Sequence, residues 1–193
     1  LFGMYQYAGS FEDAVKISEK EYYTAGVFKK MKETEMYDSK RLDEFFISDC
    51  RRKYEMMEKS GTRMIDFTED DMPERLKLIS DPPAVIFVKG SLPEKDIPSV
   101  SIIGSRQCSE YGKSVAAFFG RELASEGVQV ISGMAAGIDS PASAGALSGG
   151  NRSFAVLGSG VDVCYPSSSR SIYNEMKSGK GGIISEFCPD AAG

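Results

Sequence analysis

The sequence predicts an α/β fold built on a doubly wound, mostly parallel sheet. Short apolar runs at 101–103, 128–131 and 154–157 are partly β-branched, as buried parallel strands are. Helix-length segments separate these runs, and a glycine-bearing turn follows each of them. Alternating strands and helices imply right-handed crossovers, which bring the loops after successive parallel strands to one edge of the sheet.

A charged region with the pattern of helices precedes the sheet. Ser10 and Asp13 form an approximate capping box, and Gly26 breaks the pattern. The clearest helix follows residues 38–39 and ends before Gly61, which stands where a C′ glycine would. Its apolar residues recur at helical spacing and comprise Leu42, Phe45, Phe46, Cys50, Tyr54 and Met57. We interpret this stripe as a packing face, and a partner-binding groove is the alternative.

Between this helix and the first of the three runs, we expect two strands and a short helix. The strands cover 64–67 and 84–88, and the second is apolar throughout. The helix covers 74–79, with Asp71 as its N-cap and Pro73 in its first turn.

From the first run onward the pattern alternates regularly. The expected order is helix 110–126, strand 128–131, helix 138–147, strand 154–157, helix 169–176 and strand 183–184. We therefore divide the chain into a helical N-terminal domain over 1–62 and a sheet domain over 63–193. The α/β pattern is unfinished at Gly193, so we expect a piece of a longer chain, truncated on its C-terminal side.

Composition excludes several classes of protein. With 193 residues, of which 41% are apolar, the chain can bury a core, but no apolar stretch approaches the roughly 20 residues of a membrane helix. We recognise no signal or transit peptide and expect a cytoplasmic protein without membrane contact. The net charge of −5 argues against indiscriminate binding of polyanions, so any nucleic-acid site must be local.

Several familiar site motifs are excluded as well. The four cysteines form no C-x-x-C pair and the chain has no histidine, which leaves no familiar zinc site, and we expect neither metal nor cofactor. A redox or metal role for Cys108, Cys164 and Cys188 is a minor alternative, since each follows an expected strand. Gln107 stands where a P-loop needs glycine, and Val163 stands where the dinucleotide fingerprint needs a small residue. The residues of a hydrolase cannot be assembled around these turns either.

Three glycine-bearing turns form the candidate functional site. Gly104-Ser105-Arg106, Ser132-Gly133-Met134 and Gly158-Ser159-Gly160 each follow an apolar run, so they should share one edge of the sheet. Glycine lets backbone N–H groups approach an anion, and the helices that follow point their positive ends at the same place. We therefore predict an anionic ligand along this rim.

Two arginines accompany these turns. Arg106 belongs to the first turn, and Arg152 precedes the run that leads to the third. A guanidinium can hold a phosphate through two parallel hydrogen bonds, so two of them across the rim suit successive phosphates of a nucleic-acid strand. The alternative is that Arg106 pairs with a nearby carboxylate and Arg152 is solvated. For Asp139 and Asp162, which close two of the loops, we favour helix capping over catalysis.

A longer series of motifs resembles that of a known family. In chain order the motifs are Asp81-Pro82-Pro83, Val88-Lys89-Gly90, Ile103-Gly104-Ser105-Arg106, Ser109-x-Tyr111-Gly112, Ser132-Gly133-Met134-Ala135-x-Gly137-Ile138-Asp139, Gly145-Ala146-Leu147, Val156 to Asp162, Tyr165-Pro166 and Ser185-Glu186. From about residue 63 to residue 188 the sequence resembles the DNA-processing protein A family, also called DprA or Smf. The N-terminal part resembles the family's small SAM-like domain. The resemblance implies an extended Rossmann-like fold and a homodimer that binds single-stranded DNA, protects incoming DNA during natural transformation and helps to load the RecA recombinase, without catalysing a reaction.

The resemblance also assigns roles to the rim. Arg106 matches the family's DNA-contacting arginine, and Arg152 occupies the place of a basic residue that is commonly lysine. The implied DNA-binding wall beside these two arginines comprises Gly104, Ser105, Ser132, Gly133, Gly158, Ser159 and Gly160. At 142–144 the chain has Ala-Ser-Ala where the family usually has Ala-His-Arg, and the family's downstream Arg-Asn-Arg segment is absent.

Two other functions remain as alternatives. A phosphoribohydrolase-like enzyme on a related Rossmann-like fold would hold a mononucleotide phosphate at the same rim. The Pro-Gly-Gly-x-Gly-Thr-x-x-Glu loop of such enzymes is not found, and the glycines at 179–182 lack the threonine and glutamate at the needed offsets. A protein-interaction module acting through the helix at 42–57 is the third possibility.

Overall fold

The structure is a computed structural model, and it describes residues 44–192. The chain separates into two compact units, over Leu1–Met56 and Met57–Gly193. The expected capping box at Ser10 and Asp13, the break at Gly26 and most of the predicted N-terminal domain lie outside the described residues.

The helix predicted before Gly61 is present as α4 (Glu44–Lys59). Gly61 has φ 75°, a left-handed conformation that favours glycine just after a helix. Within the predicted apolar stripe, Met57 is buried, whereas Tyr54 is 43% exposed. The packing-face interpretation is therefore confirmed at Met57 and wrong at Tyr54, and the side chains at the other positions of the stripe lie outside the described part.

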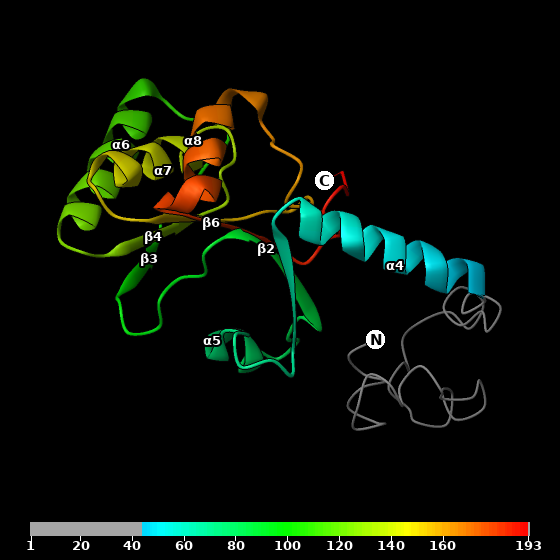
Figure 1. Cartoon of the computed structure of the whole chain (residues 1–193). Coiled ribbons are helices and arrows are strands. Elements are labelled where there is room, and N and C mark those ends of the chain that lie inside the picture. The colour runs from blue at the N-terminus through cyan, green and yellow to red at the C-terminus, as the bar shows by residue number, and fades with distance from the viewer. Residues whose placement is uncertain (1–43, 193) are drawn as a thin grey trace. The chain divides into compact units, whose positions relative to one another are not determined.

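The second unit contains a six-stranded sheet in the order β1-β2-β6-β5-β4-β3 (Figure 1). Its strands are β1 (Thr62–Asp66), β2 (Val85–Gly90), β3 (Ser99–Ser101), β4 (Gln129–Ser132), β5 (Ser153–Val156) and β6 (Gly181–Ser185). β3, β4, β5 and β6 pair in parallel with one another, and β2 pairs antiparallel with both β1 and β6. The predicted α/β fold with a mostly parallel sheet is confirmed.

Three helices connect the four parallel strands. They are α6 (Glu110–Ser125), α7 (Asp139–Ser148) and α8 (Arg170–Glu175), with short helical turns at Ser167–Ser169 and Met176–Lys180 on either side of α8. Because β3 to β6 follow one another across the sheet in chain order, right-handed crossovers place all three helices on the same face (Figure 1). A doubly wound sheet has helices on both faces, and the crossovers between β3 and β6 cover one of these faces.

The short helix α5 (Glu74–Lys77) begins differently from the expectation. Pro73 occupies the N-cap position, and no side chain caps the helix. Asp71 forms an ion pair with Arg63 instead, with 3.1 Å between the carboxylate and the guanidinium. The Asp71 carboxylate therefore contacts β1 rather than the N-terminus of the helix.

The helices α6 and α7 pack closely against each other. A Cβ at Gly120 would lie 2.1 Å from the carbonyl oxygen of Ala142, and a Cβ at Gly145 would lie 2.1 Å from that of Ala117. Glycine at both positions lets the two helix backbones touch, because it has no Cβ. The main apolar cluster comprises Met134, Leu147, Ala155, Leu157, Val161, Ile172, Tyr173, Met176 and Ile183. This packing holds α7 against α6 and the sheet.

Candidate nucleic-acid interface

The three glycine turns share one edge of the sheet, as predicted. The turn at 104–106 follows β3, the turn at 132–134 begins with the last residue of β4, and the turn at 158–160 follows β5. Since β3, β4 and β5 are parallel, the ends of these strands lie together. We call this the strand-end edge, and the opposite edge, where the parallel strands begin, the strand-start edge.

The first turn presents an unpaired cation to solvent. Arg106 is exposed, and within residues 44–192 its guanidinium has no hydrogen-bond or ion-pair partner. The turn itself is ordered by Ser105, whose hydroxyl donates to the carbonyl oxygen of Gln107 at 2.6 Å and accepts from the Gln107 N–H at 3.1 Å. The hydroxyl of Ser109 accepts from the Gly112 N–H at 3.1 Å and caps α6. Of the two possibilities for Arg106, pairing with a carboxylate does not occur among these residues.

A buried carboxylate occupies two of the backbone amides that were expected to bind the ligand. The side chain of Asp139 accepts hydrogen bonds from the N–H groups of Gly104 and Gly133, each at 3.1 Å. Asp139 is only 5% exposed. The expectation that it caps a helix is wrong, because Asp139 is the first residue of α7 and its carboxylate links the loops after β3 and β4. These two amides are therefore not available to a phosphate.

The remaining wall residues are partly covered. Ser132 is buried, and its hydroxyl donates to the carbonyl oxygen of Ile102 at 2.7 Å. Ser159 and Gly160 are buried as well, and the Gly160 N–H donates to the carbonyl oxygen of Ala191 at 2.8 Å. Gly158 is exposed, with nothing within 4 Å of where its Cβ would be. The amide expected from Gly160 is thus taken up by the segment after β6, and Gly158 is the open part of the third turn.

Arg152 does not lie beside Arg106, and the expected convergence of the two guanidiniums is wrong. Arg152 directly precedes β5, so it lies at the strand-start edge. Its guanidinium forms an ion pair with Glu94, whose N–H donates at 2.8 Å to the side chain of Gln129, the first residue of β4. A residue before a parallel strand and a turn after it are separated by the strand's length, about 13 Å for four residues at about 3.3 Å each.

The second aspartate expected to cap a helix has a different partner. Asp162 forms an ion pair with Lys89 of β2, whose side chain is only 12% exposed. Close to it, the hydroxyl of Tyr173 donates to the carbonyl oxygen of Val161 at 2.8 Å. Burial, together with the nearby Asp162 carboxylate and Cys164, raises the pKa of Tyr173, so the phenol remains a donor at neutral pH. These contacts fix the loop after β5.

Two exposed aromatic rings lie in loops of the strand-end edge that were not predicted as site residues. Tyr165, in the loop after β5, is 68% exposed, and Phe187, two residues after β6, is 50% exposed. An exposed ring is a surface on which a nucleic-acid base can stack. Both residues lie between an expected strand and the next element or the end of the sheet, and this position on the expected ligand edge is the signal that could have identified them.

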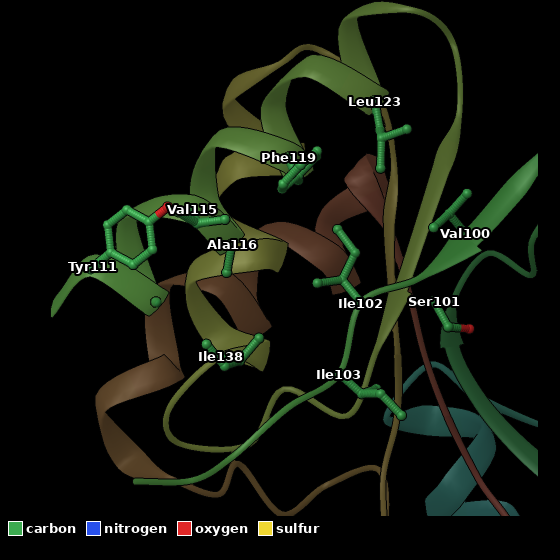
Figure 2. A pocket seen from close by; sticks show the side chains of 11 residues that line it. Val100, Ser101, Ile102, Ile103, Tyr111, Val115, Ala116, Phe119, Leu123 and Ile138 are labelled. Carbon is green, nitrogen blue, oxygen red and sulfur yellow. The ribbon is translucent and has the colours of Figure 1, made fainter. Parts of the chain in front are cut away.

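An apolar pocket of about 460 Å³ lies between β3 and α6. Figure 2 shows Phe119 and Leu123 of α6 on the side of the pocket opposite Val100 of β3 and Ile102, which follows that strand. No charged side chain lines this pocket, so it lacks the cation that a nucleotide phosphate needs. The i, i+4 spacing of Tyr111, Val115, Phe119 and Leu123 is visible in the sequence.

Two further searches cover only the part of the chain that the structure describes. Within residues 44–192 there is no group of three or more cysteine, aspartate or glutamate side chains that could hold a metal ion. Over the same residues, no helix has the length and apolar character needed to cross a membrane.

The sequence and the fold are similar to those of known proteins. The sequence profile of the family described as DNA recombination-mediator protein A matches residues 63–192. Protein Smf of Borreliella burgdorferi is 30% identical over 162 residues, which cover 78% of this chain and 52% of that protein. DNA processing protein DprA of Streptococcus pneumoniae is 32% identical over 145 residues, which cover 75% of this chain and 50% of that protein. The chain spans about half the length of these curated relatives.

Two solved structures are also similar. The X-ray structure of DprA from Streptococcus pneumoniae matches with a TM-score of 0.64 at 24% identity, over 89% of this chain and 62% of that chain, which shows the fold alone. A structure of DNA processing protein A from Helicobacter pylori, described for its single-stranded DNA binding mode, matches with a TM-score of 0.57 at 27% identity. That match covers 68% of this chain and 58% of the Helicobacter chain.

Proposed function

The chain belongs to the DNA recombination-mediator protein A family, and from this premise we propose that it binds single-stranded DNA at the strand-end edge of its sheet. The binding is independent of base sequence and involves no catalysed reaction. The observation that carries the proposal is the exposed guanidinium of Arg106, which has no partner within residues 44–192. A cation held at a sheet edge without a protein carboxylate is available to a phosphodiester.

The rest of the strand-end edge supports a strand rather than a single nucleotide as ligand. Gly158 leaves an open stretch of backbone after β5, and Tyr165 and Phe187 expose aromatic rings in the loops after β5 and β6. Proteins that hold single strands without sequence preference combine backbone cations with aromatic rings on which bases stack. Because the chain carries a net charge of −5, this attraction must come from the local arrangement and not from the overall field.

Further properties rest on the family alone. We propose that the protein acts as a cytoplasmic homodimer, takes part in DNA processing during recombination, protects incoming DNA and helps to load the RecA recombinase. The Helicobacter relative supports the DNA-binding part of this proposal, because its structure is described for single-stranded DNA binding.

The test is a titration of a fluorescently labelled oligo-dT with the wild-type chain and with Arg106→Ala. Loss of one phosphate contact should weaken binding roughly tenfold and lower the slope of log K against log salt by about one unit. The same change should appear with a labelled oligo-dA, since phosphate contacts carry no base information. Equal affinity of the wild type and the variant for oligo-dT would overturn the site. Thermal stabilisation by AMP and not by oligo-dT would favour the nucleotide-handling enzyme instead.

A further inference from the structure

Residues at the start of α7 hold the turn that carries Arg106. Gly137 has φ 91°, and a Cβ there would lie 2.0 Å from the carbonyl oxygen of Ser105 and 2.7 Å from the Cα of Arg106. The next residue, Ile138, donates its N–H to the same carbonyl oxygen at 3.3 Å. The backbone at 137–138 therefore lies directly against the Arg106 turn.

Asp139 adds a second anchor on the other side of that turn. One oxygen of its carboxylate accepts from the Gly104 N–H, and the other accepts from the Gly133 N–H. Two backbone amides from different loops thus converge on one anion, which is the usual arrangement of a phosphate site. Here the anion is the protein's own carboxylate, and it is almost fully buried.

We infer that Asp139 is a positioning residue for DNA binding, because its carboxylate ties the loops after β3 and β4 together and so fixes the direction of Arg106. This inference rests on the proposed function. Arg106 lies two residues after Gly104, whose amide is bound by Asp139, and one residue after Ser105, whose carbonyl is bound by Ile138. A turn that is ordered before binding loses little conformational freedom when a phosphate arrives. Asp139 acts through Arg106 and does not touch the DNA, since its side chain is buried.

Because Asp139 is negatively charged, the direction of the change in DNA affinity on its substitution tests the inference. Removing a negative charge near a polyanion should strengthen binding if Asp139 mattered only through its field. Asp139→Asn keeps the shape and removes the charge, but its amide nitrogen cannot accept from a backbone N–H, so one of the two loop connections is lost. A positioning role therefore predicts weaker binding, which is the opposite of the purely electrostatic effect.

The experiment is a double-mutant cycle with oligo-dT, using the wild type, Arg106→Ala, Asp139→Asn and the double variant of the whole chain. We expect Asp139→Asn to weaken binding roughly fivefold and to lower the salt slope by up to about one unit, as a lost phosphate contact would. In the Arg106→Ala background the same substitution should change the affinity less than about twofold. Thermal unfolding of each variant shows that it is folded.

Three results would overturn the inference: tighter binding by Asp139→Asn, unchanged binding, or equal weakening in both backgrounds. If Arg106→Ala itself binds like the wild type, the proposed function fails, which is a different outcome. Should Asp139→Asn not fold, Gly133→Ala decides the question. A Cβ at Gly133 would lie 2.7 Å from the Asp139 carboxylate and point toward it, so this variant displaces the carboxylate and keeps its charge. It should show the same loss of affinity, again only when Arg106 is present.

Discussion

The strand-end edge and the strand-start edge each carry an arginine, and the two arginines differ in whether a carboxylate pairs with them. At the strand-end edge, Arg106 is exposed and has no partner in the described part of the chain. At the strand-start edge, Arg152 is paired with Glu94, which is itself bound to Gln129 of β4. Both arginines flank strands of the same sheet, yet only the first is free to meet an external anion. Chemical type alone therefore does not make a ligand site, because a carboxylate partner such as Glu94 takes up a guanidinium that an external anion would need.

The largest expected effect is a loss of stability and of DNA binding at the strand-end edge. Gly137→Ala places a Cβ against the Ser105 carbonyl in a left-handed backbone conformation, so it should destabilise the protein by at least about 3 kcal/mol and abolish oligo-dT binding. Gly150→Ala is the matched control, because Gly150 has φ 88° in the turn before Arg152 but nothing within 4 Å of its Cβ position. It should cost only about 1 kcal/mol and leave binding intact. Urea denaturation measures the free energy of unfolding of both variants. Similar losses of stability would contradict the explanation by contact between the added Cβ and the Ser105 carbonyl.

An intermediate effect concerns the stability of the protein and depends on buried hydroxyl groups. The Ser143 hydroxyl is fully buried and has no hydrogen-bond partner in the described part of the chain, so Ser143→Ala should raise the free energy of unfolding by about 1 kcal/mol. Ser132→Ala is the control at the strand-end edge, where the buried hydroxyl has a partner, and it should lower that free energy by about 1 kcal/mol. Stabilisation by both substitutions, or by neither, would show that hydrogen bonding does not explain the difference.

The smallest expected effect sharpens the comparison at the strand-start edge. Arg152→Ala should change oligo-dT affinity less than about twofold and leave the salt slope as it is, because a paired arginine releases few counterions from DNA. Its side chain and that of Glu94 are both about half exposed, so the loss of stability should be under about 1 kcal/mol. A decrease in affinity as large as that of Arg106→Ala would show that DNA extends to the strand-start edge.

Most of the fold could be predicted from the sequence because its signals are local. Apolar runs, glycine after helices and helix-length spacing placed β2, β4, β5, β6 and α6 to within about two residues of their observed bounds. The shared edge of the glycine turns followed from the parallel order of the strands. These inferences need no knowledge of which distant residues touch.

Which groups of the strand-end edge are open to a ligand depends on contacts between distant parts of the chain. Asp139 binds the amide of Gly104 across 35 positions, and Ala191 covers the amide of Gly160. No spacing rule contains either contact, so the sequence alone does not show that these amides are occupied. The position of Arg152 does follow from the sequence, because a residue before a strand and a turn after that strand must lie at opposite edges.

The carboxylate of Asp139 also has a consequence for how the protein behaves in solution. The Asp139 carboxylate already accepts hydrogen bonds from the Gly104 and Gly133 amides, so sulfate or inorganic phosphate cannot bind these two groups. Such buffer ions should therefore compete with DNA mainly by raising ionic strength and not by occupying the junction of the two loops. A small oxyanion is thus left with the exposed guanidinium of Arg106 as its contact beside these loops.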